Sequence, residues 1–264
     1  MKIDYNYHSH TYLCGHAIGE PIDYVKEAIK HGYKNIGISE HAPMPNLTNR
    51  GLRLEQEDYK LYFQLLNEAE KLAKTNNINF YKGFEIEYFY DLNIYEKYLE
   101  DVDYLILGQH YIVRDGVIKS AYGLSDLEDI KIYAKTVVDA INSGYFSLVC
   151  HPELCFYNID KPTKEMYKAL EPIIIAAKEK DIPIEINANG IRKAYNRDNC
   201  KDPSCYRYPK FEFLKMVKNL NAKVMIASDA HRPEYLYDFA IEKAIDLVKA
   251  LNLDFVTTLK INKK

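Results

Sequence analysis

Short apolar runs alternate with amphipathic stretches along the 264-residue chain. Between residues 21 and 31, for example, Ile22, Val25 and Ile29 recur at helical spacing, and Gly32 follows at a position typical of a helix end. The same spacing predicts further helices over residues 57–76, 127–143, 164–181, 211–219 and 235–251. The apolar runs predict seven strands, over residues 5–7, 35–39, 79–87, 104–107, 147–150, 184–186 and 224–227.

Apolar strands separated by helices are typical of a parallel sheet that is covered on both faces. No linker, repeat or low-complexity segment interrupts the alternation. We therefore predict an α/β fold with one domain over residues 1–264, organised as a βα-barrel. A doubly wound open sheet has the same local pattern and is the alternative.

Composition narrows the range of partners. The chain carries 35 lysines and arginines against 38 aspartates and glutamates, and this net charge of −3 offers no basic surface for nucleic acid. The N-terminus lacks the apolar segment of a secretory signal, and every apolar run is far shorter than the roughly 18 residues that span a membrane. Five cysteines, an odd number, fit reduced thiols. We expect a cytoplasmic protein without membrane or nucleic-acid partners, and the oligomeric state stays open.

Histidines gather where the predicted strands end. Seven of the eight follow a strand, and these are His8, His10, His16, His41, His110, His151 and His231. The eighth, His31, lies at a predicted helix C-terminus, where a cation suits the helix dipole, and we interpret it as structural. Because the C-terminal strand ends of a barrel meet at one mouth, we expect the other seven to converge there.

The spacing of these residues indicates metal binding. His8 and His10 are two apart on a strand, so their imidazoles point to the same face, and Asp229 and His231 form a second such pair. Glu85 and Glu87 also share one face, and the pattern alone does not choose between them. Seven imidazoles and two carboxylates exceed the three or four ligands of one zinc ion, so we predict two or three divalent ions, Zn, Mn or Fe.

Other residues have plainer explanations. His151 precedes a proline, as structural turn residues often do. Cys200 and Cys205 supply only two thiols, too few for a structural zinc site.

The motifs together resemble those of the polymerase-and-histidinol-phosphatase (PHP) superfamily, and most closely its monofunctional histidinol-phosphate phosphatases. The resemblance extends over residues 1 to about 245. It rests on His8-Ser9-His10, His16, Ser39-Glu40-His41-Ala42-Pro43, Gly83-Phe84-Glu85, His110, His151 and Ser228-Asp229-Ala230-His231.

This resemblance implies a distorted (β/α)7 barrel that holds three divalent metals at the C-terminal ends of its strands. The first metal would be held by His8, His10, Glu85 and Asp229, the second by His16, His41 and His231, and the third by Glu85, His110 and His151. The family pattern thereby favours Glu85 over Glu87 as the ligand.

The resemblance also implies the reaction. A metal-bridging hydroxide would hydrolyse a small phosphomonoester, L-histidinol phosphate, to L-histidinol and phosphate in histidine biosynthesis. Asp229 and His231 would take part in catalysis, and Arg192 would bind the phosphate. Relatives often carry an arginine shortly after the equivalent of His151, whereas here Glu153 lies in that segment and is suited only to a substrate amine.

Three alternatives remain. The chain could hydrolyse another phosphomonoester, or a phosphodiester or nucleotide, within the same superfamily. A metal-dependent amidohydrolase also begins with a His-x-His pair, but it would give no reason for His16, His41 and His231 together. An inactive metal-binding module would be expected to have lost ligands, and none is missing here.

Overall fold

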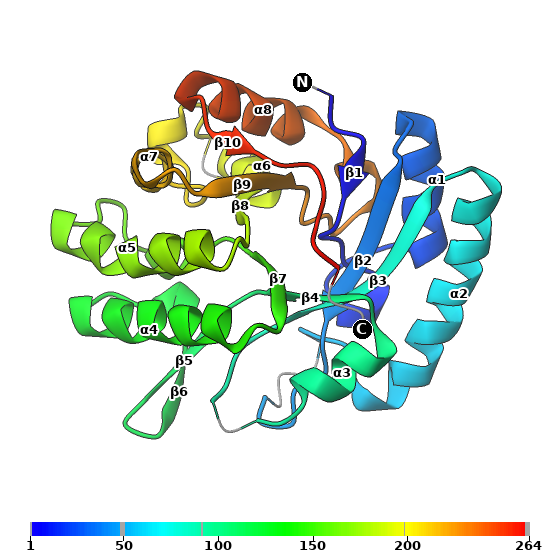
Figure 1. The fold of residues 1–264 in the computed structure, drawn as a ribbon, viewed down its shortest axis with the longest axis horizontal. Coiled ribbons are helices and arrows are strands. Elements are labelled where there is room, and N and C mark those ends of the chain that lie inside the picture. The colour runs from blue at the N-terminus through cyan, green and yellow to red at the C-terminus, as the bar shows by residue number, and fades with distance from the viewer. Residues whose placement is uncertain (1, 48–50, 91, 198, 262–264) are drawn as a thin grey trace.

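A curled parallel sheet forms the centre of the molecule (Figure 1). The computed structural model describes residues 2–47, 51–90, 92–197 and 199–261. Within these residues the sheet has eight strands, all parallel to their neighbours. Their spatial order is β1 (Tyr5–Asn6), β2 (Asn35–His41), β3 (Asn79–Ile86), β4 (Tyr104–Leu107), β7 (Phe146–Val149), β8 (Ile184–Asn187), β9 (Lys223–Ala227) and β10 (Asp254–Phe255).

Helices cover the outside of this sheet. They include α1 (Pro21–His31), α2 (Tyr59–Thr75), α4 (Leu127–Ser143), α5 (Lys164–Glu179), α7 (Phe211–Leu220) and α8 (Phe239–Leu251). Helices α1 and α2 pack together on one side of the molecule, and α4 and α5 pack together on the other (Figure 1). The parallel α/β organisation predicted from the sequence is therefore confirmed.

The structure also contains elements that the apolar pattern did not predict. These are α3 (Tyr95–Asp101), the antiparallel hairpin of β5 (Tyr111–Arg114) and β6 (Val117–Ser120), α6 (Ala188–Arg197) and β10. The helix predicted to begin at Tyr235 begins instead at Phe239. Residues Pro233–Leu236 form a separate 3-10 turn, and the Asp238 side chain caps α8 by accepting a hydrogen bond from the Ala240 amide.

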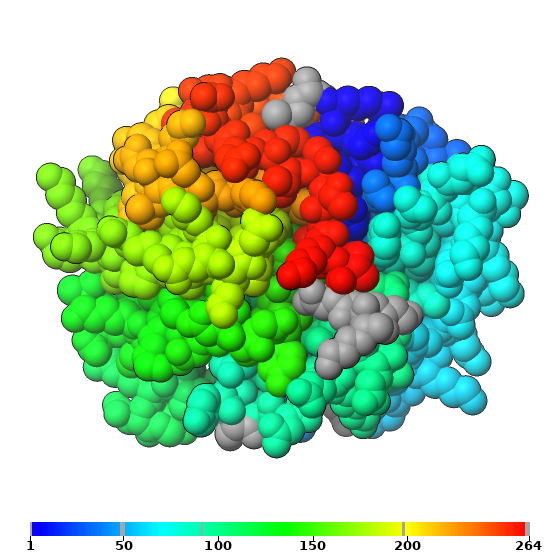
Figure 2. Space-filling view, in the orientation of Figure 1, coloured from blue at the N-terminus to red at the C-terminus, as the bar shows by residue number. Residues whose placement is uncertain are grey.

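The two ends of the curled sheet are closed by different contacts. Beyond β1 and β9, Ser9 and Ala230 form a parallel bridge, and the His10 amide donates to the Ala230 carbonyl at 2.9 Å. At the opposite end, the segment after β10 crosses the visible face (Figure 2), and Leu259 on it is 3% exposed. The bridged end is where the predicted ligands lie.

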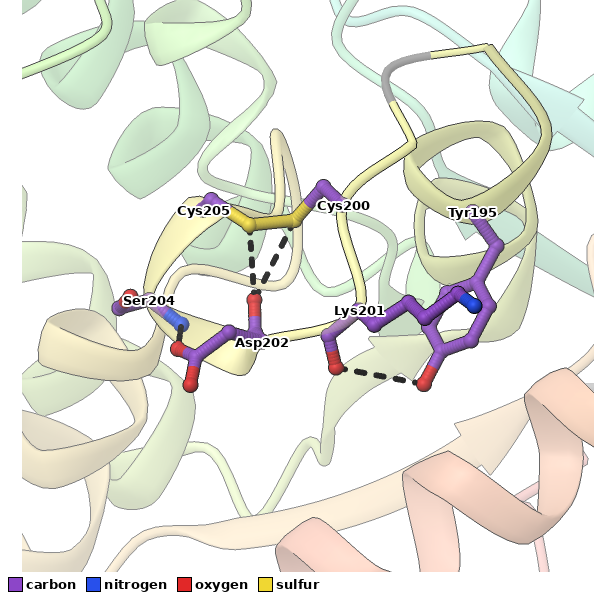
Figure 3. Close-up of a disulfide and its surroundings, with 6 residues drawn as sticks. All are labelled: Tyr195, Cys200, Lys201, Asp202, Ser204 and Cys205. Atoms are coloured by element: carbon purple, nitrogen blue, oxygen red, sulfur yellow. Dashed lines mark hydrogen bonds between the residues drawn. A yellow bond between two sulfur atoms is a disulfide. The ribbon is translucent and has the colours of Figure 1, made fainter.

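The expectation of five reduced cysteines is wrong for one pair. Cys200 and Cys205 form a disulfide in the loop between α6 and α7 (Figure 3), while Cys14, Cys150 and Cys155 are free and buried. Residues Pro203–Cys205 form a 3-10 turn that brings the two cysteine Cα atoms to 6.1 Å, a span that a disulfide bridges readily.

The described residues include no helix with the length and apolar character needed to cross a membrane.

Tyr104 fills the space enclosed by the curled sheet, beneath the strand ends that carry the predicted ligands. It is fully buried, and its hydroxyl donates to the Tyr7 carbonyl at 2.7 Å. Glycines on the two preceding strands, Gly37 and Gly83, make room for the ring, since a Cβ at either position would overlap it. The absence of side chains at these two positions thus permits close packing of the interior.

We predict that Gly83→Ala lowers the free energy of unfolding by about 1–3 kcal/mol, because the added methyl overpacks the Tyr104 ring. Chemical denaturation followed by circular dichroism measures this change. Gly123→Ala is the matched control, since its new methyl would meet nothing within 4 Å. Equal stability of the two variants would show that the interior adjusts without strain.

Candidate metal centre

Two candidate ligand motifs that are 221 positions apart in the sequence are joined through their backbones. The His10 amide donates to the Ala230 carbonyl, and the Ala230 amide donates to the His8 carbonyl at 3.3 Å. Asn6 strengthens the junction, because its side chain donates to the His8 carbonyl and accepts from the Ser228 amide. The pairs His8/His10 and Asp229/His231 therefore face the same point.

Four ligand atoms surround the first candidate position. The Nε2 atoms of His8 and His10 are 3.1 Å apart, and Asp229 Oδ1 lies 3.7 and 3.3 Å from them. Glu85 Oε2 is buried and lies 3.5 and 3.4 Å from the same two nitrogens and 2.8 Å from His41 Nδ1. Two imidazole nitrogens and two carboxylate oxygens arranged in this way fit a divalent cation.

The second candidate position lies nearer the surface. His16 and His231 face each other with their Nε2 atoms 3.1 Å apart, and the His41 ring stacks 5.3 Å from that of His16. Backbone carbonyls orient two of these rings: Cys14 accepts from His16 Nδ1, and Asp229 accepts from His231 Nδ1, each at 3.1 Å. Three imidazoles fit zinc, iron or manganese.

The third candidate position uses the other oxygen of Glu85. Its Oε1 atom lies 3.0 Å from His151 Nε2 and 3.6 Å from His110 Nε2. Glu85 thus presents one oxygen to the first group and one to the third, as a bridging carboxylate would. The structure brings all nine sequence-predicted ligands together, and His31 lies apart, where it contacts Glu27.

Three further carboxylates contact the Nδ1 atoms of candidate-ligand histidines, on the side of the ring away from the cluster. Glu185 Oε1 accepts from His8 Nδ1 at 2.6 Å, and Glu40 Oε1 lies 3.3 Å from His10 Nδ1. Glu87 Oε1 accepts from His110 Nδ1 at 3.0 Å. In each case the contact at Nδ1 leaves Nε2 directed inward, the arrangement in which outer carboxylates orient metal-binding histidines.

Glu87 is itself held by Arg53, a residue that the sequence did not single out. The guanidinium contacts both Glu87 oxygens, at 3.1 and 3.2 Å, and donates to the Ala42 carbonyl at 3.1 Å. Arg53 is 5% exposed and Glu87 1%. The strand pattern did not decide between Glu85 and Glu87 as the candidate ligand. The contacts favour Glu85, because Glu87 is held by Arg53 and contacts the Nδ1 atom of His110, on the side of the ring away from the other candidate ligands.

Two candidate ligands adopt an uncommon backbone conformation. His151 has φ of 30° and Asp229 of 45°, the left-handed region that side chains other than glycine rarely enter. Their surroundings hold them there: Glu185 Oε2 accepts from the His151 amide, and Asn187 and Asn189 each donate to Asp229 Oδ2 at 3.1 Å. Strain of this kind clusters at functional sites, where neighbouring contacts maintain it.

Charge is distributed unevenly over the cluster. Burial opposes ionisation of Glu85, yet His41, His8 and His110 outweigh this and hold the pKa of its carboxyl well below the usual range. Burial, followed by the charge of His10, lowers the pKa of His41 well below its ordinary value and that of His231 to about 3. Burial also opposes protonation of His10, yet Asp229, Glu40 and Glu85 outweigh it and raise the pKa of His10 to about 9. Because metals bind neutral imidazoles and ionised carboxylates, an ion at the first position would have to displace the proton of His10.

A cavity of about 560 Å³ opens above the cluster. Tyr122, Tyr157 and Tyr235 contribute to its walls. Arg192, Lys193 and Arg232 add positive charge. Among the described residues that line it, the only carboxylates are the candidate ligands Glu85 and Asp229.

Arg192 and Glu153 have contacts that the sequence did not predict. Arg192 is 2% exposed, and its Nε and Nη2 atoms donate to the two carboxylate oxygens of Asp238 at 2.6 and 3.0 Å. Glu153 is fully buried and is not part of the cavity wall, so it does not face a substrate amine there. Its Oε1 accepts from the Lys210 amide at 3.2 Å, and its Oε2 has no hydrogen-bond partner in the described chain.

Comparisons with known proteins agree with this geometry. The model of the PHP domain family matches residues 6–189. A protein of Caldicellulosiruptor bescii named "Probable phosphatase" is 28% identical over 88% of this chain and 81% of its own length, and a "Probable histidinol-phosphatase" of Deinococcus radiodurans is 25% identical over 86% and 85%. The crystal structure of histidinol phosphate phosphatase (HISK) from Lactococcus lactis, complexed with Zn, L-histidinol and phosphate, has the same fold, with a TM-score of 0.73 at 21% identity over the whole of both chains.

A cluster of imidazoles and carboxylates at the floor of a cavity, on the strand ends of a curled parallel sheet, defines the class of metal-dependent hydrolases. Within that class, the chain belongs to the PHP domain family.

We predict that the purified, reconstituted protein carries two to three transition-metal ions, and that Glu85→Gln loses at least one, because the amide cannot bridge two positions with charged oxygens. Glu87→Gln should keep the stoichiometry and weaken binding by about 10–100-fold, as expected for a residue behind a ligand. Elemental analysis and competition with a chelator measure both quantities. Greater metal loss in Glu87→Gln would reverse the assignment.

A further prediction concerns stability and pH. Burial raises the pKa of Glu153 from 4.5 to about 7, so the folded state holds a proton that the unfolded state releases between these values. Stability should therefore fall as pH rises from about 4.5 to 7, by up to about 3 kcal/mol from this group. Denaturation of Glu153→Gln across pH 5–8 should give a flatter profile and a more stable protein at the alkaline end. An unchanged profile would show that Glu153 ionises without cost.

Proposed function

We propose that the chain hydrolyses phosphomonoesters at the candidate metal centre. One observation carries the proposal: Glu85 is shared between two groups of ligand atoms, and a third group of imidazoles adjoins them at the floor of a positively lined cavity. The bridge between Ser9 and Ala230 supports the (β/α)7 barrel that the sequence resemblance implies, with the metals at its C-terminal mouth.

The position of each candidate ligand in the site determines the role that we propose for it. Divalent ions bound at such a site supply Lewis acidity and lower the pKa of a bound water toward 7. Glu85 and Asp229, both ionised, would hold these ions and balance part of their charge. His231 sits at the cavity wall beside Asp229, where it would hold an ion next to the reacting phosphate. The buried His8 and His10 would fix the deepest ion, beyond the reach of bulk water.

Arg192 remains a candidate phosphate ligand, in a limited form. Its Nε/Nη2 edge is occupied by Asp238, and Nη2 also donates to the Tyr235 carbonyl. Nη1 lies 3.4 Å from the Ser228 carbonyl and is the nitrogen with an N–H to spare for a substrate oxygen. A two-pronged grip on phosphate would require the pair with Asp238 to open.

L-Histidinol phosphate is the substrate that we propose. The Lactococcus lactis protein with the same fold was solved with L-histidinol and phosphate, and the Deinococcus radiodurans relative carries the histidinol-phosphatase name. The tyrosines Tyr122, Tyr157 and Tyr235 would accommodate the imidazole ring by stacking and by hydrogen bonds from their hydroxyl groups. This activity would place the chain in histidine biosynthesis.

A panel of phosphomonoesters tests the proposal on metal-loaded protein. We predict the highest kcat/KM for L-histidinol phosphate, at least about tenfold above p-nitrophenyl phosphate, which corresponds to about one well-made hydrogen bond. Equal values would leave a general phosphomonoesterase and remove the link to histidine. A phosphodiester or an amide turned over faster than every monoester would reject the proposal in favour of a nuclease-like enzyme or an amidohydrolase.

A further inference from the structure

The three cations that line the cavity differ in how they are neutralised. Arg192 is paired with Asp238, and Arg232, 47% exposed at its side chain, lies 3.6 Å from Glu234. Lys193 has no carboxylate partner among the residues that the structure describes. It is therefore the cation of the cavity wall whose charge remains available to a ligand.

The surroundings of Lys193 place its ammonium group close to the third group of ligands. Its Nζ donates to the Tyr208 hydroxyl at 3.1 Å and lies 5.7 Å from the centre of the Tyr208 ring. That ring is 1% exposed and packs edge-on against His151, with ring centroids 5.7 Å apart. Tyr208 thus contacts both Lys193 and His151, a candidate ligand of the cluster.

The fold gives Lys193 this position through helix α6. The helix starts directly after β8, so residues of its first two turns lie at the strand ends where the ligands gather. Arg192 and Lys193 are neighbours there, but Arg192 is nine-tenths or more buried in contacts with Asp238, Tyr235 and Ser228. Lys193 is half-buried and borders the open space.

We propose that Lys193 binds the phosphate group of the substrate, on the side of the cavity that His110 and His151 form. This inference rests on the proposed phosphatase function and refines it. An ammonium group has three donors, so the bond to Tyr208 leaves two for phosphate oxygens. Lysine here supplies the positive charge that the segment after His151 lacks, where the nearest basic residue along the chain is Lys161.

Lys193→Met tests this role because methionine keeps a side chain of similar length without the charge. Calorimetric titration of metal-loaded protein with inorganic phosphate should give a Kd at least about tenfold higher than wild type, and KM for phosphomonoesters should rise more than kcat falls. Lys193→Arg should recover most of the affinity. Metal content should not change in either variant, and Lys249→Met, on the exposed face of α8, is the matched control.

Tyr208→Phe, alone and combined with Lys193→Met, distinguishes direct phosphate binding by Lys193 from an indirect effect through Tyr208. If Lys193 acted only through the Tyr208 hydroxyl, adding Lys193→Met to Tyr208→Phe would weaken phosphate binding no further, and this outcome would overturn the proposal. A direct contact predicts a further loss of phosphate affinity in the double variant. A Kd for phosphate and a KM within about twofold of wild type in Lys193→Met would also overturn it. A fall in kcat for alkyl phosphates but not for p-nitrophenyl phosphate, at unchanged KM, would identify a proton donor instead. Wild-type protein that hydrolyses no phosphomonoester would reject the proposed function itself.

Discussion

A single buried carboxylate, surrounded by imidazoles, is the interaction on which the functional end of the molecule depends. Glu85 is 1% exposed, and its two oxygens face rings contributed by several strand ends. A carboxylate loses much of its hydration at such a depth, and only nearby positive charge offsets that loss. The curled sheet meets this demand because its strand ends bring donors from distant parts of the chain to one place.

Orientation of the rings is a second requirement, and polar groups behind the cluster meet it. Glu40 and Glu185 lie fully buried, each against the Nδ1 atom of a ligand histidine. Such groups are costly to bury without a partner, so each is also bonded elsewhere: Glu40 accepts from the Thr11 amide and hydroxyl, and Glu185 from Asn187. The mouth of the sheet is therefore a connected polar network, supported from below by the apolar interior around Tyr104.

The sequence predicted those features that depend on local order. The parallel strands follow from periodicity and are confirmed, and the candidate ligands that follow the strands lie together in the structure. It could not predict contacts between distant residues: Arg53 meets Glu87 across 34 positions and Asp238 engages Arg192 across 46. The sequence pattern did not predict helix α6, because Asn189 and Gly190 at its start have low helix propensity. The motif Glu185-Ile186-Asn187 held a signal for the outer network, since charged and amide side chains rarely end an apolar strand without a partner.

The different depths of the candidate ligands would affect how bound metal exchanges. His8 and His10 are wholly shielded, whereas His16 is exposed and the His231 side chain is 20% accessible. An ion among the shielded ligands could leave only after the mouth of the sheet had opened, while one at the rim could exchange directly with the medium. The inner ion would then reflect the supply of metal while the chain folds, and the rim ion the supply at the moment of turnover.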